Sequence, residues 1–190
     1  MKKLWQHMNR GLLLLFVAIL AVSTYLLIDN AQTKKDKAKI KDISEQFINE
    51  SSVYFVCPSE PQFWEQGQWT EEALASLMTA ATNKMESFFC ENEAVRHAQV
   101  KYFFPFFDNC RANQLCPVNC TRTPLLIEIS EIYNGSATVF VSTQTTVEFI
   151  KEDGSRVSQV YTSNETLLFL KQETEWKLVS AEIHLDTTNP

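Results

Sequence analysis

Five cysteines are the residues of this chain whose type and spacing point most directly to chemistry. They are Cys57, Cys90, Cys110, Cys116 and Cys120. A cysteine can form a disulfide, ligate a metal as the thiolate or act as a nucleophile. A zinc site needs four well-spaced ligands, and the Cys-x5-Cys-x3-Cys run has no C-x2-C pair and no histidine nearby. The spacing therefore favours disulfides over a metal centre.

The setting of each cysteine suggests how they pair. The last three lie in one short stretch with no periodic apolar pattern, where a covalent link would stabilise a loop. We expect Cys57 to pair with Cys90 and Cys110 to pair with Cys116 or Cys120. One thiol is then left over, and it is free, buried as a small apolar group, or cross-linked to a second copy in a homo-oligomer.

The rest of the chain matches no catalytic or cofactor signature. It has no hydrolase-like spacing of serine, histidine and acid, and its four glycines argue against a phosphate-binding loop. The net charge of −6 argues against a nucleic-acid-binding surface. We therefore expect no cofactor, no metal and no nucleic-acid partner, and we assign no catalytic residue.

An apolar segment near the N-terminus decides which compartment the cysteines occupy. Eighteen uncharged, mostly apolar residues run from Gly11 to Ile28. A helix rises about 1.5 Å per residue and the bilayer core is about 30 Å thick, so this segment spans a membrane once. We interpret it as an uncleaved anchor, because cleavage near Ser23 would leave an apolar new terminus. The alternative is a cleaved signal peptide and a secreted domain.

The remainder of the chain is expected on the extracytoplasmic side. Basic residues flank the span on both sides, so charge does not fix its orientation, whereas the density of cysteines favours an oxidising compartment. We assign residues 1–10 as a cytoplasmic basic head and residues 29–39 as a stalk. Residues 40–190 form one domain by length, with a cysteine loop at 108–121.

The first elements expected in this domain are helices. Ile40 and Phe47 belong to a stripe with three- and four-residue steps, which predicts a helix beginning in the stalk. Thr70 is a candidate N-cap for a second helix. The apolar face of that helix comprises Leu74, Leu77, Met78, Ala81, Met85 and Phe88. The aromatic-rich stretch before Pro105 fits a helix or a strand, and the proline is expected to end it.

After the cysteine loop the apolar period changes to two, which indicates strands. Leu125–Ile129 alternates and leads into Asn134-Gly135, a strong hairpin signal. Three further strands are expected at 139–149, 157–170 and 176–185. Strands of this length are expected to twist or bulge. The fold class is therefore α+β: an N-terminal transmembrane helix, then two or three helices packed on a curved four-stranded antiparallel sheet.

The last expected strand carries a short motif, E-W-K-L-V-S-A-E-I at positions 175–183. Alternation places Trp176 and Leu178 on the face opposite Ala181. Helices followed by a long meander that closes on such a motif resemble the nuclear transport factor two-like, or cystatin-like, superfamily over Ile40–Leu185. With its single span, the chain resembles bitopic assembly factors of type IV secretion and conjugation machines and small anchored proteins of Gram-positive bacteria, although the cysteine loop belongs to neither pattern.

We interpret the chain as a non-enzymatic, membrane-anchored interaction domain with a protein partner in the cell envelope, because the span gives it a location, the cysteine loop gives it a surface and no cluster of polar residues indicates a reaction. Enzymes of the superfamily, such as ketosteroid isomerases and dehydratases, place an acid or base in the mouth of the cone. The corresponding candidates here are Glu128, Glu148, Glu165, Glu182 and His184. Alternate residues of a half-exposed strand are normally charged, so we expect these side chains to face solvent. An isomerase or hydratase and a binder of a small apolar ligand are the alternatives.

Aromatic residues form the remaining candidate surface. They are Phe103, Phe104, Phe106 and Phe107 around a proline, and Trp64 and Trp69 in the loop after the first cysteine. Phenylalanine is usually buried, so we expect the four phenylalanines to fill the interior. The alternative is an exposed docking patch for a partner or a lipophilic ligand. The tryptophans either pack on the sheet edge or form part of a recognition surface.

Overall fold

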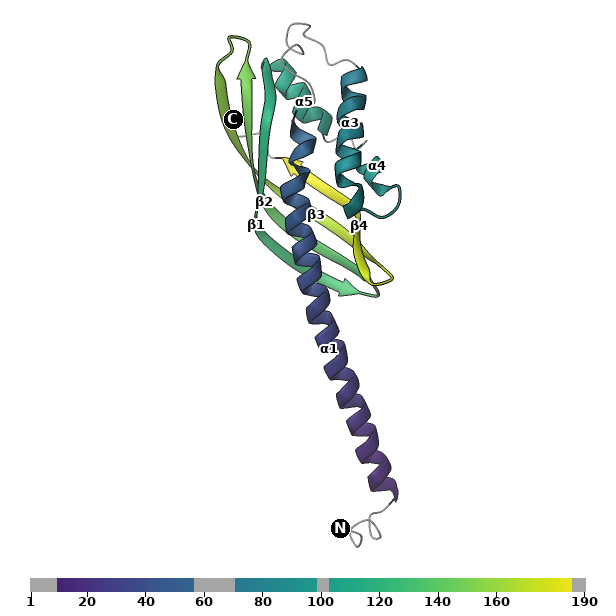
Figure 1. The fold of residues 1–190 in the computed structure, drawn as a ribbon. Helices are drawn as coiled ribbons and strands as arrows, with labels where there is room; N and C mark the ends of the chain where they lie inside the picture. The colour runs from purple at the N-terminus through teal and green to yellow at the C-terminus, as the bar shows by residue number, and fades with distance from the viewer. Residues whose placement is uncertain (1–9, 57–70, 99–102, 186–190) are drawn as a thin grey trace. The chain divides into compact units, whose positions relative to one another are not determined.

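The computed structural model describes residues 10–56, 71–98 and 103–185. The chain forms two compact units, Met1–Lys39 and Ile40–Pro190. The elements in chain order are α1 (Arg10–Glu50), the 3-10 helix η1 (Ser51–Phe55), α3 (Glu71–Met85), the 3-10 helix η2 (Glu86–Phe88), α4 (Glu93–Ala98), α5 (Phe103–Ala112), β1 (Leu115–Tyr133), β2 (Ser136–Lys151), β3 (Arg156–Gln172) and β4 (Glu175–Leu185). Helices followed by a four-stranded sheet confirm the expected α+β class (Figure 1).

Helix α1 combines two segments that the sequence analysis treated separately. It runs for 41 residues from the apolar stretch through the lysines to Glu50. By length and composition it is long and apolar enough to cross a membrane, and none of its most apolar window is buried. One apolar helix that could anchor the chain is therefore present. The stripe predicted farther along α1 is also found, because Ile40 and Phe47 are fully buried and Ile43 packs partly buried against the core.

The described residues between α1 and the sheet include three α-helices, which match the prediction only in part. Helix α3 lies where the second helix was expected, and α3, α4 and α5 lie on one side of the sheet (Figure 1). The expectation that Pro105 ends an element was wrong, since Pro105 lies in the first turn of α5. A first-turn residue has no intrahelical partner for its N–H, so proline is tolerated there.

The sheet is an antiparallel meander in the order β1-β2-β3-β4. The β1–β2 turn has a left-handed backbone at both Asn134 (φ 48°) and Gly135 (φ 75°), as the hairpin signal predicted. Strand β1 starts at Leu115, ten residues before the predicted strand, so residues 108–121 do not form an irregular loop. Instead they contain the end of α5 and the start of β1.

Bulges curve the long strands, as expected from their length. The pairing of β1 with β2 shifts register after Pro117, after Pro124 and after Ile129. A proline cannot donate a ladder hydrogen bond, so it fits an edge strand at such an irregularity. Strand β4 also shifts register against β3, and Val179 is the extra residue.

The bulge in β4 corrects the predicted faces of that strand. Trp176 and Leu178 are buried, and so are Ala181 and Ile183, while Val179 is exposed. An inserted residue reverses the alternation of the side chains that follow it. Ala181 and Ile183 therefore lie on the same face of β4 as Trp176 and Leu178. The edge of β4 is partly covered, because Phe89 forms a parallel bridge with Leu178 and the Cys90 N–H donates to the Leu178 carbonyl at 2.8 Å.

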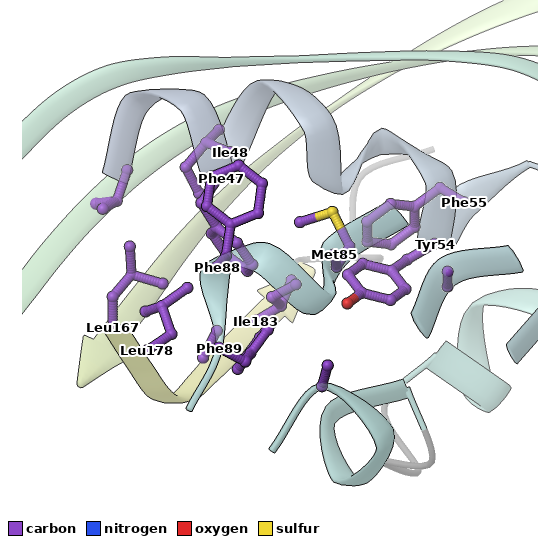
Figure 2. Close-up of a cluster of buried hydrophobic side chains, with 14 of the residues drawn as sticks. Phe47, Ile48, Tyr54, Phe55, Met85, Phe88, Phe89, Leu167, Leu178 and Ile183 are labelled. Atoms are coloured by element: carbon purple, nitrogen blue, oxygen red, sulfur yellow. The ribbon is translucent and has the colours of Figure 1, made fainter. Parts of the chain in front are cut away.

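The core of residues 40–190 lies between the concave face of the sheet and the helices. Figure 2 shows Phe47 facing Phe88 and Phe89, and the three rings meet edge to face with centroids 5.7–5.9 Å from Phe47. Leu167 and Leu178 supply the sheet side of this cluster. Edge-to-face contacts and burial of this kind stabilise a single packing arrangement.

Candidate functional site

A buried ion pair is the most unusual polar feature of the described structure. Arg122 on β1 and Glu165 on β3 are only 1% and 2% exposed, and one guanidinium nitrogen of Arg122 (Nη2) donates a hydrogen bond to Glu165 Oε1. The two strands are separated by β2. The arginine side chain therefore reaches across the middle of the concave face to join the first and third strands.

The other donors of Arg122 contact two more elements. Nη1 donates to Ser51 Oγ at the start of η1, and Nε donates to Thr145 Oγ1 on β2 at 3.2 Å. The guanidinium also lies over the ring of Phe55, 5.1 Å from its centroid. A flat arginine group suits such a site because it can donate in several directions and stack on an aromatic face. Arg122 thus links three strands and the turn that follows α1.

Hydroxyl groups surround the carboxylate of Glu165. Ser163 Oγ donates to Oε1 at 3.2 Å, and the hydroxyl of Thr143 also interacts with the carboxylate. Burial raises the pKa of Glu165, while the charge of Arg122 and the hydroxyl hydrogen bonds act in the opposite direction. An arginine stays charged in proteins, so Glu165 is the member of this pair that can change its protonation.

The geometry of this pair argues for a structural role. Neither side chain has any solvent-exposed surface. A general acid or base must come within hydrogen-bond reach of a reacting group, so a sealed carboxyl has no substrate to act on. The pair instead fixes the relative positions of η1 and the sheet.

His97 on α4 lies in the aromatic cluster, near the same charge. It is 4% exposed, and its ring centroid lies 5.0 Å from those of Tyr54 and Phe89. Burial, together with the nearby charge of Arg122, lowers the pKa of His97 to about 3. The imidazole is therefore neutral at physiological pH and packs as an aromatic ring.

A small cavity of about 130 Å³ lies between α5 and the sheet, near the end of the concave face. Its lining comprises Phe106, Asn109, Cys110, Asn113, Leu115, Phe149, Gln159 and Tyr161. A cavity of about 150 Å³ holds a molecule the size of benzene. Glu165 does not line this cavity, so the cavity lacks the buried carboxyl that an isomerase-type site would require.

The four described carboxylates among the strand candidates, those of Glu128, Glu148, Glu165 and Glu182, do not gather into a site. Glu128 and Glu182 are exposed, and Glu148 is paired with Arg156 at 2.7 Å on the surface. The side chain of His184 lies outside the described residues. The expectation of a solvated side chain was wrong for Glu165, because Arg122 allows its charge to be buried.

The structure describes the side chains of two of the six aromatic candidates. Phe106 and Phe107 are buried, and Phe106 meets the rings of Phe55 and Phe149, so these two belong to the core and not to a docking patch. Phe103 and Phe104 lie in α5, and their side chains are outside the described residues, as are Trp64 and Trp69.

The cysteines do not form the expected links in the described structure. No disulfide joins any two of Cys90, Cys110, Cys116 and Cys120, and Cys57 lies outside the described residues. The predicted bridge from Cys110 to Cys116 or Cys120 is therefore not present. The physical reason is that α5 and β1 hold these residues by packing, so this stretch is regular and does not need a covalent link.

Thiol labelling should report this packing. Burial raises the pKa of both Cys110 and Cys120 to about 12, which lowers their reactive thiolate fraction about a thousandfold from an ordinary cysteine. We expect an alkylating reagent to modify these two cysteines more than a hundredfold faster in denaturant than in the native protein. Peptide mapping by mass spectrometry separates them from Cys57. Equal native and denatured rates, or loss of two hydrogens from a peptide pair, would contradict this packing.

Sequence reasoning missed Arg122, Ser51 and His97. One signal was available on β2, where the apolar alternation that includes Val141 and Val147 is interrupted by two threonines at 143 and 145. Two polar residues in succession on the inward face of a strand indicate a polar group inside the core. Nothing in the spacing identified arginine as that group.

No protein-family model and no curated protein matches this chain. Similar solved structures include an uncharacterized protein with a cystatin-like fold from Caulobacter vibrioides, at 16% identity over 65% of this chain and 85% of that one, with a TM-score of 0.35. Another is CagV, a VirB8 homologue of T4SS from Helicobacter pylori, at 10% identity over 76% and 98%, with a TM-score of 0.41. Both similarities are to chains less than 25% identical to this one, with TM-scores below 0.5.

Proposed function

We propose that this chain is a single-pass membrane protein whose residues 40–190 form an extracytoplasmic interaction domain of the nuclear transport factor two-like type. It acts in the assembly of an envelope complex and not as an enzyme. One observation carries the proposal: the exposed apolar segment and the buried Ile40 and Phe47 belong to the same continuous helix, α1. The helix that would be anchored is also part of the core of the domain.

The interior of the domain supports a role without catalysis. Its concave face is filled by aromatic and aliphatic side chains, and its one described buried carboxylate, Glu165, is sealed against Arg122. The cavity beside α5 has room for one small ring at most. A reaction site would need an exposed acid or base next to a space for substrate.

The outer face of the sheet supports a protein partner. Large apolar side chains are exposed there on all four strands: Leu126, Phe140, Leu168, Leu170 and Val179. Exposed apolar residues grouped on one face are typical of interaction sites. Because polar residues lie between them, this surface suits a partner that binds and dissociates in an aqueous compartment.

Two matched double variants test the anchor and the partner surface separately. Ile19→Lys/Leu20→Lys places two charges at the centre of the span, and we expect it to move the chain from the membrane fraction to the soluble fraction. Leu126→Lys/Leu168→Lys adds the same charge on the outer face and should leave the chain in the membrane. It should also abolish chemical cross-links to envelope proteins that the unmodified chain forms.

Orientation is tested with a reporter enzyme that folds only in an oxidising compartment, fused after Pro190. An active reporter is the expected result. An inactive reporter, or a full-length chain that migrates as a lone monomer in mild detergent and forms no cross-links, would overturn the proposal.

A further inference from the structure

The lysines that follow the apolar span form a compact basic group. Lys34, Lys35 and Lys37 are exposed on α1, six to nine residues after Ile28. At about 1.5 Å per residue they lie about 9 to 14 Å along the helix beyond the end of the span. We call these three residues the lysine collar.

The direction of the helix brings the side chains of the collar closer to the membrane than their Cα atoms. In an α-helix each Cα–Cβ bond tilts toward the helix N-terminus. The N-terminal part of α1 is the apolar span, so the lysine side chains lean toward the bilayer. Lysine also has a long flexible stem that lets its ammonium group reach the interface, and the headgroup layer is about 5 to 8 Å thick.

Two nearby aspartates offset part of the positive charge of the collar. Asp36 lies within the collar sequence but is 7% exposed, and it accepts a hydrogen bond from Gln32 Nε2 at 3.2 Å. Asp29 is exposed beside the span. Residues 29–39 therefore hold four lysines and two aspartates, a net charge of +2, and all four lysines are exposed. The positive charge is concentrated where a lipid headgroup would lie.

We propose that the lysine collar binds anionic phospholipid headgroups on the membrane surface that faces the folded domain. The inference rests on the proposed function, since it requires the span to be in a bilayer. Ammonium groups donate charge-assisted hydrogen bonds to phosphate oxygens. The attraction of a charged membrane surface falls off within a Debye length of about 8 Å at physiological salt. Lys41, about 20 Å beyond Ile28, is therefore outside its range.

The full chain is reconstituted into phosphatidylcholine vesicles and into equal mixtures of phosphatidylcholine and phosphatidylglycerol. After gentle detergent extraction, native mass spectrometry measures the ratio of the two lipids that remain bound. The test variant is Lys34→Gln/Lys35→Gln/Lys37→Gln. The matched control is Lys41→Gln/Lys84→Gln/Lys151→Gln, which removes the same charge from exposed positions outside the collar.

We expect the unmodified chain and the control to retain an excess of phosphatidylglycerol. In the test variant, each lysine removed should lower the ratio of bound phosphatidylglycerol to bound phosphatidylcholine about fivefold. Added salt should reduce the excess in the unmodified chain. A ratio equal to that of the bulk lipid, or equal losses in the two variants, would overturn the inference and leave the proposed function standing. A chain that fails to float with any vesicle would overturn both.

Discussion

Replacing Arg122 with methionine is expected to lower the free energy of unfolding by about 3 to 5 kcal/mol. The substitution leaves Glu165 buried without its cation and removes the donors that reach Ser51 and Thr145. Removing one member of a buried pair is costly because the remaining charge has lost its solvent and its partner. Chemical denaturation of the full chain in detergent, followed by tryptophan fluorescence, measures the change.

A surface ion pair provides the matched control for this substitution. Arg156 and Glu148 are 2.7 Å apart, but their side chains are 66% and 28% exposed. Arg156→Met should cost about 1 kcal/mol or less, because water replaces the lost partner. The double variant Arg122→Met/Glu165→Leu should regain much of the stability that Arg122→Met loses, since it leaves no buried charge. A loss below 1 kcal/mol for Arg122→Met would contradict the description of a sealed ion pair.

Acid should destabilise the domain through His97. The folded-state pKa of about 3 lies below the ordinary value of 6.5, so the unfolded chain binds a proton that the folded chain does not between those two pH values. The stability that neutral His97 confers is complete above pH 6.5 and is lost as pH falls toward 3. At pH 4.5 the loss is about 3 kcal/mol.

The comparison that isolates this effect is with His97→Phe, which keeps an aromatic ring beside Tyr54 and Phe89. We expect the stability of the variant to change less steeply with pH between 6.5 and 4.5. Protonation of Glu165 changes stability in the opposite direction, because its raised pKa favours the folded state at low pH. This contribution is the same in both proteins and does not affect the comparison. Parallel pH profiles for the two proteins would rule out a buried neutral imidazole.

The sheet could be predicted because its signals are local. Alternation along residues 139–149 and 157–170, with a turn at Asn134-Gly135, is sufficient to define a meander. The beginning of β1 could not be found in this way, since Pro117 and the cysteines interrupt the alternation. Those residues are held in the strand by pairing with β2, a contact distant in sequence.

The polar interior was beyond sequence reasoning for a related physical reason. Arg122 and Glu165 are separated by 43 positions, and Ser51 lies 71 positions from Arg122. From the local sequence alone, each of these residues would be predicted to lie on the surface. Only the register of three strands and the position of η1 bring them together, and a single sequence does not encode register explicitly.

The inserted residue in β4 shows the same limit on a smaller scale. The motif around Trp176 is correctly a strand, yet strict alternation assigned Ala181 to the wrong face. The position of this bulge depends on how β4 pairs with β3 and with Phe89. Local pattern therefore identified the element, and tertiary packing decided which face of it is buried.

Both borders of the sheet carry features that disfavour pairing with a further strand, which would matter for a protein held at a membrane. Edge strand β1 contains Pro117 and Pro124, which have no N–H to donate to a neighbouring strand, while Phe89 and Cys90 occupy part of the border of β4. Anchored molecules meet often because they diffuse in two dimensions, and open borders would let them join strand to strand into fibrils. These features make joining of strands between copies less favourable, so crowding of anchored copies would favour contacts through side chains and complexes of finite size.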